Sequence, residues 1–194
     1  GCDDISLITA PRRAQRVGQV ILHPGADLAL LFLPIDKEPF TFFDEALRRG
    51  QDGFASGYPQ GLPGDVYSHL IGRAQMKSVG RYRTTEPIVA WAEIQRQPGN
   101  LSALGGLSGG PMLNKYGEVI GVLVAASQRR GRGMTSDLDS INWLINQADL
   151  SLNTTATPNS LTVENFEDIG DDMRNQFRIT KVICDVRHSS RRPR

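Results

Sequence analysis

The chain has 194 residues, of which 39% are hydrophobic and 22% are charged, and its net charge is +1. These values are ordinary for a globular protein and exclude an overall field that would recruit nucleic acid or anionic lipid. No apolar run reaches the roughly 20 residues that a membrane-spanning helix needs. The 20 glycines and 11 prolines recur between short apolar runs, which predicts many short strands in place of long helices.

The N-terminal quarter of the chain predicts three strands. Residues 5–9 alternate apolar and polar side chains, and residues 16–22 form a second run that ends at the turn beginning with His23. Residues 28–33 are almost entirely apolar and stop at Pro34. Because this third run is short and proline ends it, we expect a buried strand there and not a helix.

The middle of the chain predicts a series of strands followed by one helix. The expected strands span residues 54–56, 66–79, 88–94, 112–113 and 119–126. Residues 57–64 and 98–110 are rich in Gly and Pro and are expected to be shaped loops. Residues 137–148 change to a helical period, with Ser136 or Asp137 placed to cap the first turn.

The composition changes after residue 150. We expect a linker rich in Ser, Thr and Asn at residues 151–160 and an acidic helix at residues 164–177. A strand at residues 178–186 and a basic tail at residues 187–194 are expected to follow. The two cysteines, Cys2 and Cys184, lie at opposite ends of the chain. Such a pair does not predict a disulfide framework. We expect neither a metal site nor a cofactor.

A serine between glycines gives the strongest chemical signal in the sequence. Residues 106–111 read Gly-Leu-Ser-Gly-Gly-Pro. Glycines on both sides can hold Ser108 on a tight, exposed turn, so that its hydroxyl projects from the chain. The backbone N–H groups of Gly106 and Ser108 could then converge as an oxyanion hole. The alternative is a Gly-rich hairpin loop that contains an incidental serine.

An aspartate before the third N-terminal strand gives a second signal. Asp27 immediately precedes the apolar run 28–33. A carboxylate in this position can orient a histidine, fix its tautomer and stabilise its imidazolium form. The alternative is a turn aspartate that caps the strand.

Taken together, these segments resemble the trypsin-like serine proteases, especially their HtrA/Deg-type branch. Residues 106–111 match the nucleophile pattern Gly-x-Ser-Gly-Gly-Pro, and the run Asp-Leu-Ala-Leu-Leu from Asp27 resembles the strand that carries the triad aspartate. Residues 57–62 resemble the Gly-x-Pro-x-Gly-Leu loop of the same branch. The hairpin at 114–121 and the helix at 137–148 also fall where the family has them.

The resemblance implies an all-β fold, the chymotrypsin-like double β-barrel. The protease domain would span residues 1–150, with an incomplete first barrel at about 1–50. The second barrel and its closing helix would occupy about 51–150. Residues 151–194 would form a linker and a C-terminal extension.

The resemblance also implies the roles of individual residues. Ser108 would be the nucleophile, Asp27 would orient the general base, and the N–H groups of Gly106 and Ser108 would form the oxyanion hole. Substrate-binding positions would be Ser102, at the base of the primary pocket, and three residues of one strand, Val124, Ala125 and Ala126. Because position 102 carries no acidic side chain, a small or medium apolar residue is favoured before the scissile bond.

In this family the general-base histidine precedes the aspartate, which would place it upstream of Gly1. His23, His69 and His188 do not follow this order and are interpreted as turn, strand and tail residues. We therefore predict a serine endopeptidase that acts on peptide or protein substrates, with a histidine supplied upstream and little activity in this chain alone.

Two alternatives to this prediction remain. The first is a catalytically inactive, protease-like module that binds peptides or partners. The second is contact with nucleic acid or an acidic partner through the basic residues 187–194, although nucleic acid is not the partner that we expect.

Overall fold

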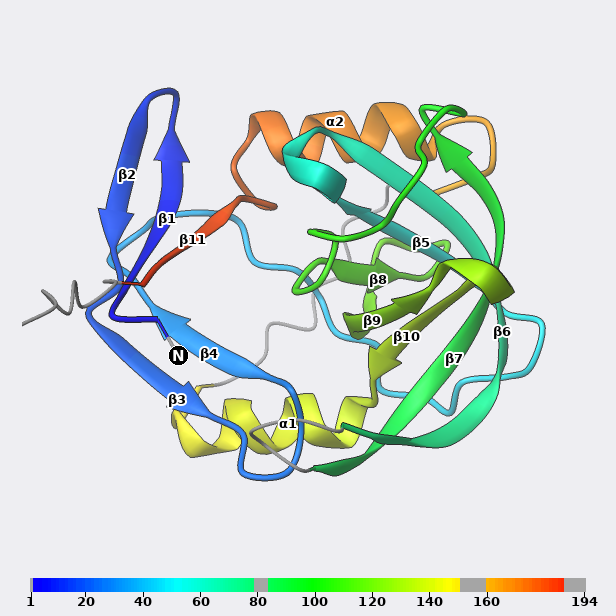
Figure 1. Ribbon diagram of the computed structural model, residues 1–194, viewed down its shortest axis with the longest axis horizontal. Helices are drawn as coiled ribbons and strands as arrows, with labels where there is room; N and C mark the ends of the chain where they lie inside the picture. The colour runs from blue at the N-terminus through cyan, green and yellow to red at the C-terminus, as the bar shows by residue number, and fades with distance from the viewer. Residues whose placement is uncertain (1, 79–83, 151–159, 187–194) are drawn as a thin grey trace, which may run out of the picture.

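Six antiparallel strands from the middle of the chain close into a barrel (Figure 1). The structure, a computed structural model, describes residues 2–78, 84–150 and 160–186. In the order of their pairing, the barrel strands are β10 (Arg132–Ser136), β7 (Thr85–Gln97), β6 (Gly64–Lys77), β5 (Asp52–Gly57), β8 (Pro111–Leu113) and β9 (Val119–Ser127). Strand β9 pairs with β10 and closes the ring. The five strands expected between residues 54 and 126 are all present, and β10 is an additional one.

Apolar side chains fill the interior of this barrel. Trp91 is fully buried at its centre, beside Val89 and Ile120. The indole Nε1–H of Trp91 donates to Oγ1 of Thr135 at 3.1 Å, so the polar atom of the ring is paired inside the core. A Cβ atom at Gly53 would lie only 2.6 Å from the Trp91 ring, so only glycine fits at position 53.

Residues 4–32 lie opposite the barrel in Figure 1 and form the N-terminal half of the fold, which contributes four strands to two small, open sheets. These strands are β1 (Asp4–Ala10), β2 (Arg13–Arg16), β3 (Gln19–Leu22) and β4 (Ala29–Phe32). Strands β1 and β2 belong to one sheet, and β3 and β4 form the other. The single strand predicted for residues 16–22 is thus wrong in its bounds, because the chain leaves the first sheet after Arg16 and enters the second at Gln19.

Strand β4 is less buried than its apolar sequence predicted. Ala29 is exposed, and Leu30, Leu31 and Phe32 are only half-buried. The physical reason is that β4 belongs to a two-stranded sheet, which gives its side chains few neighbours. This outcome agrees with an incomplete first barrel, and the predicted all-β class is confirmed.

Helix α1 (Leu138–Gln147) follows β10 and lies below the β3–β4 sheet in Figure 1. The Asp137 carboxylate accepts a hydrogen bond from the N–H of Ser140 at 2.9 Å, which makes Asp137 the N-cap. Ile141 and Leu144 are the buried apolar residues of the helix. Both the predicted helix and one of its two proposed caps are confirmed.

The C-terminal extension packs against both halves of the protein. Its acidic helix and its strand are present as α2 (Phe166–Asn175) and β11 (Val182–Asp185). Phe166 and Met173 of α2 are buried against Phe54 and Tyr67 of the barrel. Strand β11 pairs with β1, so the extension completes a three-stranded sheet of the N-terminal half (Figure 1). Of the predicted linker, residues 151–159 lie outside the described part of the chain, as does the tail at 187–194.

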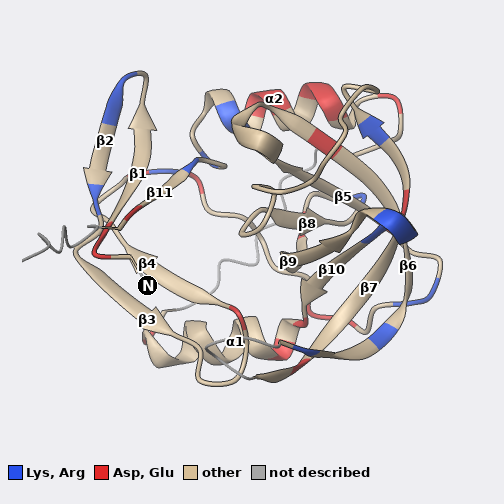
Figure 2. Cartoon of the chain, in the orientation of Figure 1, with Lys and Arg blue, Asp and Glu red and all other residues tan. Residues whose placement is uncertain are grey.

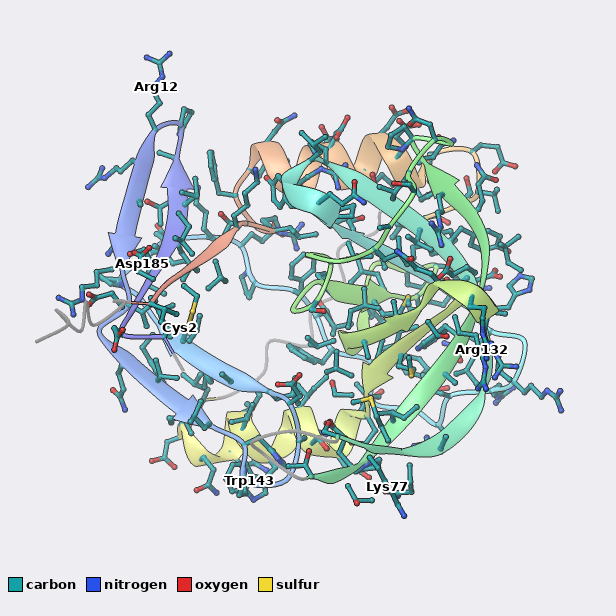
Figure 3. The ribbon with its side chains drawn as sticks, viewed as in Figure 1. Cys2, Arg12, Lys77, Arg132, Trp143 and Asp185 are labelled. Atoms are coloured by element: carbon teal, nitrogen blue, oxygen red, sulfur yellow. A yellow bond between two sulfur atoms is a disulfide. The ribbon has the colours of Figure 1, made fainter. Side chains whose placement is uncertain are left out.

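The two cysteines form a disulfide, contrary to the expectation from sequence. Cys184 lies opposite Ile5 in the β1–β11 ladder, which brings its Cα to 5.2 Å from that of Cys2. The sequence separation of 182 residues therefore gave no guide to their distance, because the pairing of β11 with β1 joins the two ends of the chain. Figure 3 shows this bond beside β11.

Candidate active site

Residues 98–110, the serine loop, hold Ser108 on a turn at the surface. Leu107 is 3% exposed and anchors the loop in the barrel core, whereas Ser108 is exposed. Gly106 and Gly109 on either side have φ angles of 97° and 86°, a region that favours glycine. The N–H of Gly109 donates to the carbonyl of Leu123 on β9 at 2.8 Å, which fixes the turn beside the barrel.

Two backbone donors of this turn are unused. Among the hydrogen bonds between described residues, the N–H groups of Gly106 and Ser108 donate none, although the N–H of Leu107 between them bonds to the carbonyl of Leu104 at 3.0 Å. Unpaired N–H groups on either side of one residue, next to an exposed hydroxyl, could bind an anion or a developing oxyanion.

A second loop supports the serine loop from behind. Residues 57–64, the support loop, contain the short 3₁₀ turn η1 (Pro59–Gly61). The N–H of Gln60 in this loop donates to the carbonyl of Gly105 at 2.6 Å. A Cβ atom at Gly106 would lie 2.8 Å from the carbonyl oxygen of Tyr58. The two loops are therefore packed so closely that position 106 has no space for a side chain.

The support loop is itself fixed by a buried ion pair with the C-terminal extension. The guanidinium of Arg174 on α2 bonds to both carboxylate oxygens of Asp65 and also donates to the carbonyls of Gly57 and Gly64 at 3.4 Å. Burial alone would lower the pKa of Arg174, but its hydrogen bonds to Asp65 and Asp171 outweigh burial and raise that pKa. The guanidinium thus stays charged while it holds both ends of the support loop.

Asp27 lies on the other half of the protein, at the turn before β4. Its side chain is exposed, and its backbone N–H donates to Oε2 of Glu86 at 2.8 Å. Asp27 and Gly109 line one cavity of about 850 Å³ between the two halves, whereas Ser108 lines a neighbouring cavity of about 510 Å³. The structure therefore brings the Asp27 turn and the serine loop to the same hollow, without a hydrogen bond between Asp27 and Ser108.

The two described histidines hydrogen-bond to neither Ser108 nor Asp27, although His23 lines the same cavity as Asp27 and Gly109. Nδ1 of His23 accepts a hydrogen bond from the N–H of Gly25 at 3.1 Å, and its ring packs edge-on against Trp143 of α1, with 4.7 Å between the centroids. His69 lies on β6 of the barrel, with its Nε2 2.7 Å from the Tyr67 hydroxyl. Within residues 2–78, 84–150 and 160–186, no histidine hydrogen-bonds to Ser108 or Asp27. His188 lies outside these residues.

The expected substrate-binding residues lie in the serine loop itself and on β9. Ser102 is exposed, and its Oγ accepts a hydrogen bond from Nε2 of Gln60 at 3.3 Å. Val124, Ala125 and Ala126 lie on β9, of which Ala125 and Ala126 pair with β10. None of these four lines the cavity that contains Ser108.

Several residues near the site have no local signal in the sequence. Glu86 is fully buried, and its Oε1 has no hydrogen-bond partner among the described residues. Arg174 and the segment that follows α2 were assigned only to an extension. No local signal could have revealed them, because their contacts join segments that are distant in sequence. The described residues contain no cluster of three metal-ligating His, Cys, Asp or Glu side chains, and neither described helix is long and apolar enough to cross a membrane.

These features together are those of a trypsin-like protease. Residues 2–122 match the family model of the trypsin-like peptidase domain, and the chain belongs to this family. It is 29% identical over 141 residues to "Protease Do-like 5, chloroplastic" of Arabidopsis thaliana, which covers 70% of this chain and 42% of that protein. The predicted resemblance to the HtrA/Deg-type branch is thereby confirmed, although the chain spans less than half the length of this relative.

Solved structures share the fold. The active form of the Rv3671c protease from M. tuberculosis superimposes with a TM-score of 0.61 at 19% identity, over 78% of this chain and 67% of that one. The MamO protease domain from Magnetospirillum magneticum gives a TM-score of 0.52 at 22% identity, over 73% and 75% of the two chains. At these identities the likeness establishes the architecture alone.

Proposed function

We propose that this chain carries the nucleophile, the oxyanion hole and the triad aspartate of a serine endopeptidase, whose general-base histidine comes from sequence upstream of Gly1. The observation that carries the proposal is the exposed hydroxyl of Ser108, which lies beside two unused backbone N–H groups. These groups belong to Gly106 and to Ser108 itself. A glycine loop without chemistry has no need of free donors beside a displayed hydroxyl. Membership of the trypsin-like peptidase family supports the same function.

The geometry supports a division of roles between the two halves. Ser108 would attack the scissile carbonyl, and the N–H groups of Gly106 and Ser108 would bind the oxyanion. The upstream histidine would take the proton of Ser108 and pass it to the leaving amine. Asp27 would orient this histidine, and the cavity between the Asp27 turn and Gly109 is where the imidazole would have to lie.

The roles that we propose for four residues in binding the substrate follow the pattern of the family. Ser102 would lie at the base of the primary pocket, and Val124, Ala125 and Ala126 would pair with the acyl part of the peptide. Position 102 offers no counter-charge to Lys or Arg, so a small or medium apolar residue is expected before the scissile bond.

Labelling by a fluorophosphonate probe, which reacts with an activated serine, tests this proposal. The chain of residues 1–194 and a longer protein that includes the upstream coding sequence are compared, each with a Ser108→Ala control. We expect rapid labelling of the longer protein, labelling at least a thousandfold slower in the 194-residue chain, and none in the Ser108→Ala variants. Rapid labelling of the short chain would show that the histidine is not needed from upstream.

A non-catalytic binding module is the second candidate. The observation in its favour is that the described histidines contact Trp143 and Tyr67 and not Ser108. If the longer protein bound peptides in the cleft but was neither labelled nor able to cleave them, the binding module would replace the peptidase.

A further inference from the structure

Residues 178–182, the crossing segment, form a fixed wall beside the serine loop. The N–H groups of Arg178 and Ile179 both bond to the carbonyl of Met173 at the end of α2, at 2.9 and 3.2 Å. Ile179 is buried in the core, and Val182 begins β11. Figure 1 shows this segment passing from α2 on the barrel to β1 on the N-terminal half. Because both ends are held, its side chains have defined places.

The crossing segment and the serine loop line one cavity of about 510 Å³. Gly106 and Ser108 contribute from the serine loop, and Tyr58 and Gly61 contribute from the support loop. A cavity of this size is within the range that holds small ligands or short stretches of peptide. Whatever occupies it lies next to the Ser108 hydroxyl.

The charged residues that line this cavity are both cations. Arg178 and Lys181 are the only described lining residues with a formal charge, and neither forms an ion pair with a carboxylate in the described parts of the chain. Figure 2 shows Lys and Arg colouring on the stretch between α2 and β11. The cavity therefore has a positive charge that no carboxylate of the described residues neutralises through an ion pair.

Both cations are positioned by contacts that leave their charge available. Nζ of Lys181 donates to the carbonyl of Gly61 at 2.5 Å and lies 4.8 Å from the centroid of the Tyr58 ring. An ammonium group has three donors, so two remain. The guanidinium of Arg178 donates to the carbonyls of Glu38 and Pro39 at 3.2 and 3.4 Å and lies 4.3 Å from the centroid of the Phe40 ring. Carbonyls and aromatic rings attract a cation without cancelling its charge.

The position of the cavity indicates which part of a substrate it would receive. Ser102 and the β9 residues proposed to bind the acyl part are absent from its described lining. The peptide after the scissile bond would extend from Ser108 away from those residues, and the crossing segment lines the Ser108 cavity from which they are absent. A carboxylate on that peptide would meet the ammonium of Lys181, an exposed residue of the cavity lining, in a charge-assisted hydrogen bond that solvent partly screens.

We infer that the crossing segment forms the leaving-group subsite, and that Lys181, with Arg178, selects substrates with a carboxylate just after the scissile bond. The inference rests on the proposed function, since it assigns the substrate class of the same site. The carboxylate could belong to an Asp or Glu side chain or to the free C-terminus of the substrate.

Peptide binding to the 194-residue chain tests the inference without the need for catalysis. Four fluorescent peptides share an apolar part before the scissile bond and differ only after it. Three have an amidated C-terminus and carry Asp, Asn or Lys directly after the scissile bond. The fourth carries Asn there and has a free C-terminal carboxylate. Fluorescence anisotropy should give an affinity for the Asp peptide about five times that for the Asn peptide, with the Lys peptide weakest. Comparison of the free-carboxylate peptide with the Asp peptide shows whether the subsite binds a C-terminal carboxylate more tightly than an Asp side chain.

Substitutions at position 181 then assign the preference to one residue. Lys181→Met should weaken binding of the Asp peptide about threefold, and Lys181→Glu should weaken it about tenfold and reverse the order of the Asp and Lys peptides. The control is Lys77→Met, which removes the same charge from the exposed end of β6, far from the crossing segment (Figure 3). Unfolding midpoints of all variants show that the fold is intact.

The outcomes separate this inference from the proposed function. Equal binding of the Asp, Asn and Lys peptides, a preference that survives Lys181→Glu, or no measurable binding of any peptide would overturn the carboxylate subsite. Cleavage by the longer protein with no acidic preference would overturn the subsite and leave the peptidase. An acidic preference in binding, without any cleavage by the longer protein, would support the subsite and refute the peptidase.

Discussion

The guanidinium of Arg174 is paired with the carboxylate of Asp65 by two hydrogen bonds of 2.8 and 2.7 Å, across 109 positions of sequence. Their side chains are 4% and 2% exposed. The pair joins α2 to the start of β6, next to the loop that supports Gly105 and Gly106. A helix of the C-terminal extension is thus coupled, through buried charges, to the backbone of the candidate oxyanion hole.

Removing either partner should be strongly destabilising, because it leaves the other charge buried without compensation. We expect Arg174→Met and Asp65→Ala each to lower the free energy of unfolding by about 3–5 kcal/mol, and the double variant to lose less than the sum. Urea denaturation measures all three. Arg132→Met removes an exposed arginine at the far end of the barrel (Figure 3) and should change stability by less than about 0.5 kcal/mol. Additive losses in the double variant would show that the pair is not coupled.

Gly170→Ala should destabilise the protein although alanine favours helices. A Cβ atom at position 170 of α2 would overlap Oδ1 of Asp65 and lie 2.9 Å from Oγ of Ser56. We expect a loss of about 1–3 kcal/mol from the forced shift of the helix, which exceeds the propensity gain of about 1 kcal/mol. Gly72→Ala on β6, where a Cβ meets nothing within 4 Å, is the control and should be neutral or slightly stabilising. A stabilised Gly170→Ala variant in thermal unfolding would mean that α2 is not tightly seated.

The Cys2–Cys184 disulfide should stabilise the fold by joining the two ends of the chain. Because it closes a loop of nearly the whole chain, its loss should cost about 2–5 kcal/mol. Calorimetry with and without reductant, and on the Cys2→Ser/Cys184→Ser variant, measures this cost. Reductant should have no further effect on the double variant, and an equal unfolding temperature in all samples would contradict the prediction.

Stability should decline at alkaline pH because of Tyr67. Burial, followed by the hydrogen bond to Asp52 at 2.9 Å, raises the pKa of Tyr67 from 10.0 to about 12. The folded state thus holds the phenolic proton that the unfolded chain releases first, so the contribution is complete below pH 10 and is lost as pH rises toward 12. Tyrosinate absorbance should show a late-titrating group, which Tyr67→Phe should abolish together with part of the alkaline loss of stability.

Gly106→Ala should impair the oxyanion site and leave most of the fold unchanged. The φ of 97° and the carbonyl of Tyr58 at 2.8 Å both oppose a Cβ atom, so the 106 N–H must turn away. In the longer protein, we expect kcat to fall about 100-fold or more, with a smaller change in KM. Gly105→Ala, where a Cβ meets nothing within 4 Å, is the matched control. Equal kcat in the two variants would argue against the oxyanion role of Gly106.

The sequence by itself determined the local features of this protein. The alternation and length of apolar runs predicted the barrel strands, and the helical period with Asp137 before it predicted α1. The display of Ser108 was also predictable, because the flanking glycines supply the positive φ angles that the turn needs. Each of these signals lies within a few residues of the feature that it specifies.

Only the tertiary structure decided the long-range features. The Cys2–Cys184 bond, the Arg174–Asp65 pair and the place of Lys181 beside the serine loop depend on where α2 and β11 pack. That packing comes from apolar side chains buried against the barrel and from strand pairing with β1. The hydrogen bond between Glu86 and Asp27 depends on how β7 meets the turn before β4. Such contacts are made between segments more than 50 residues apart, and no local pattern encodes them.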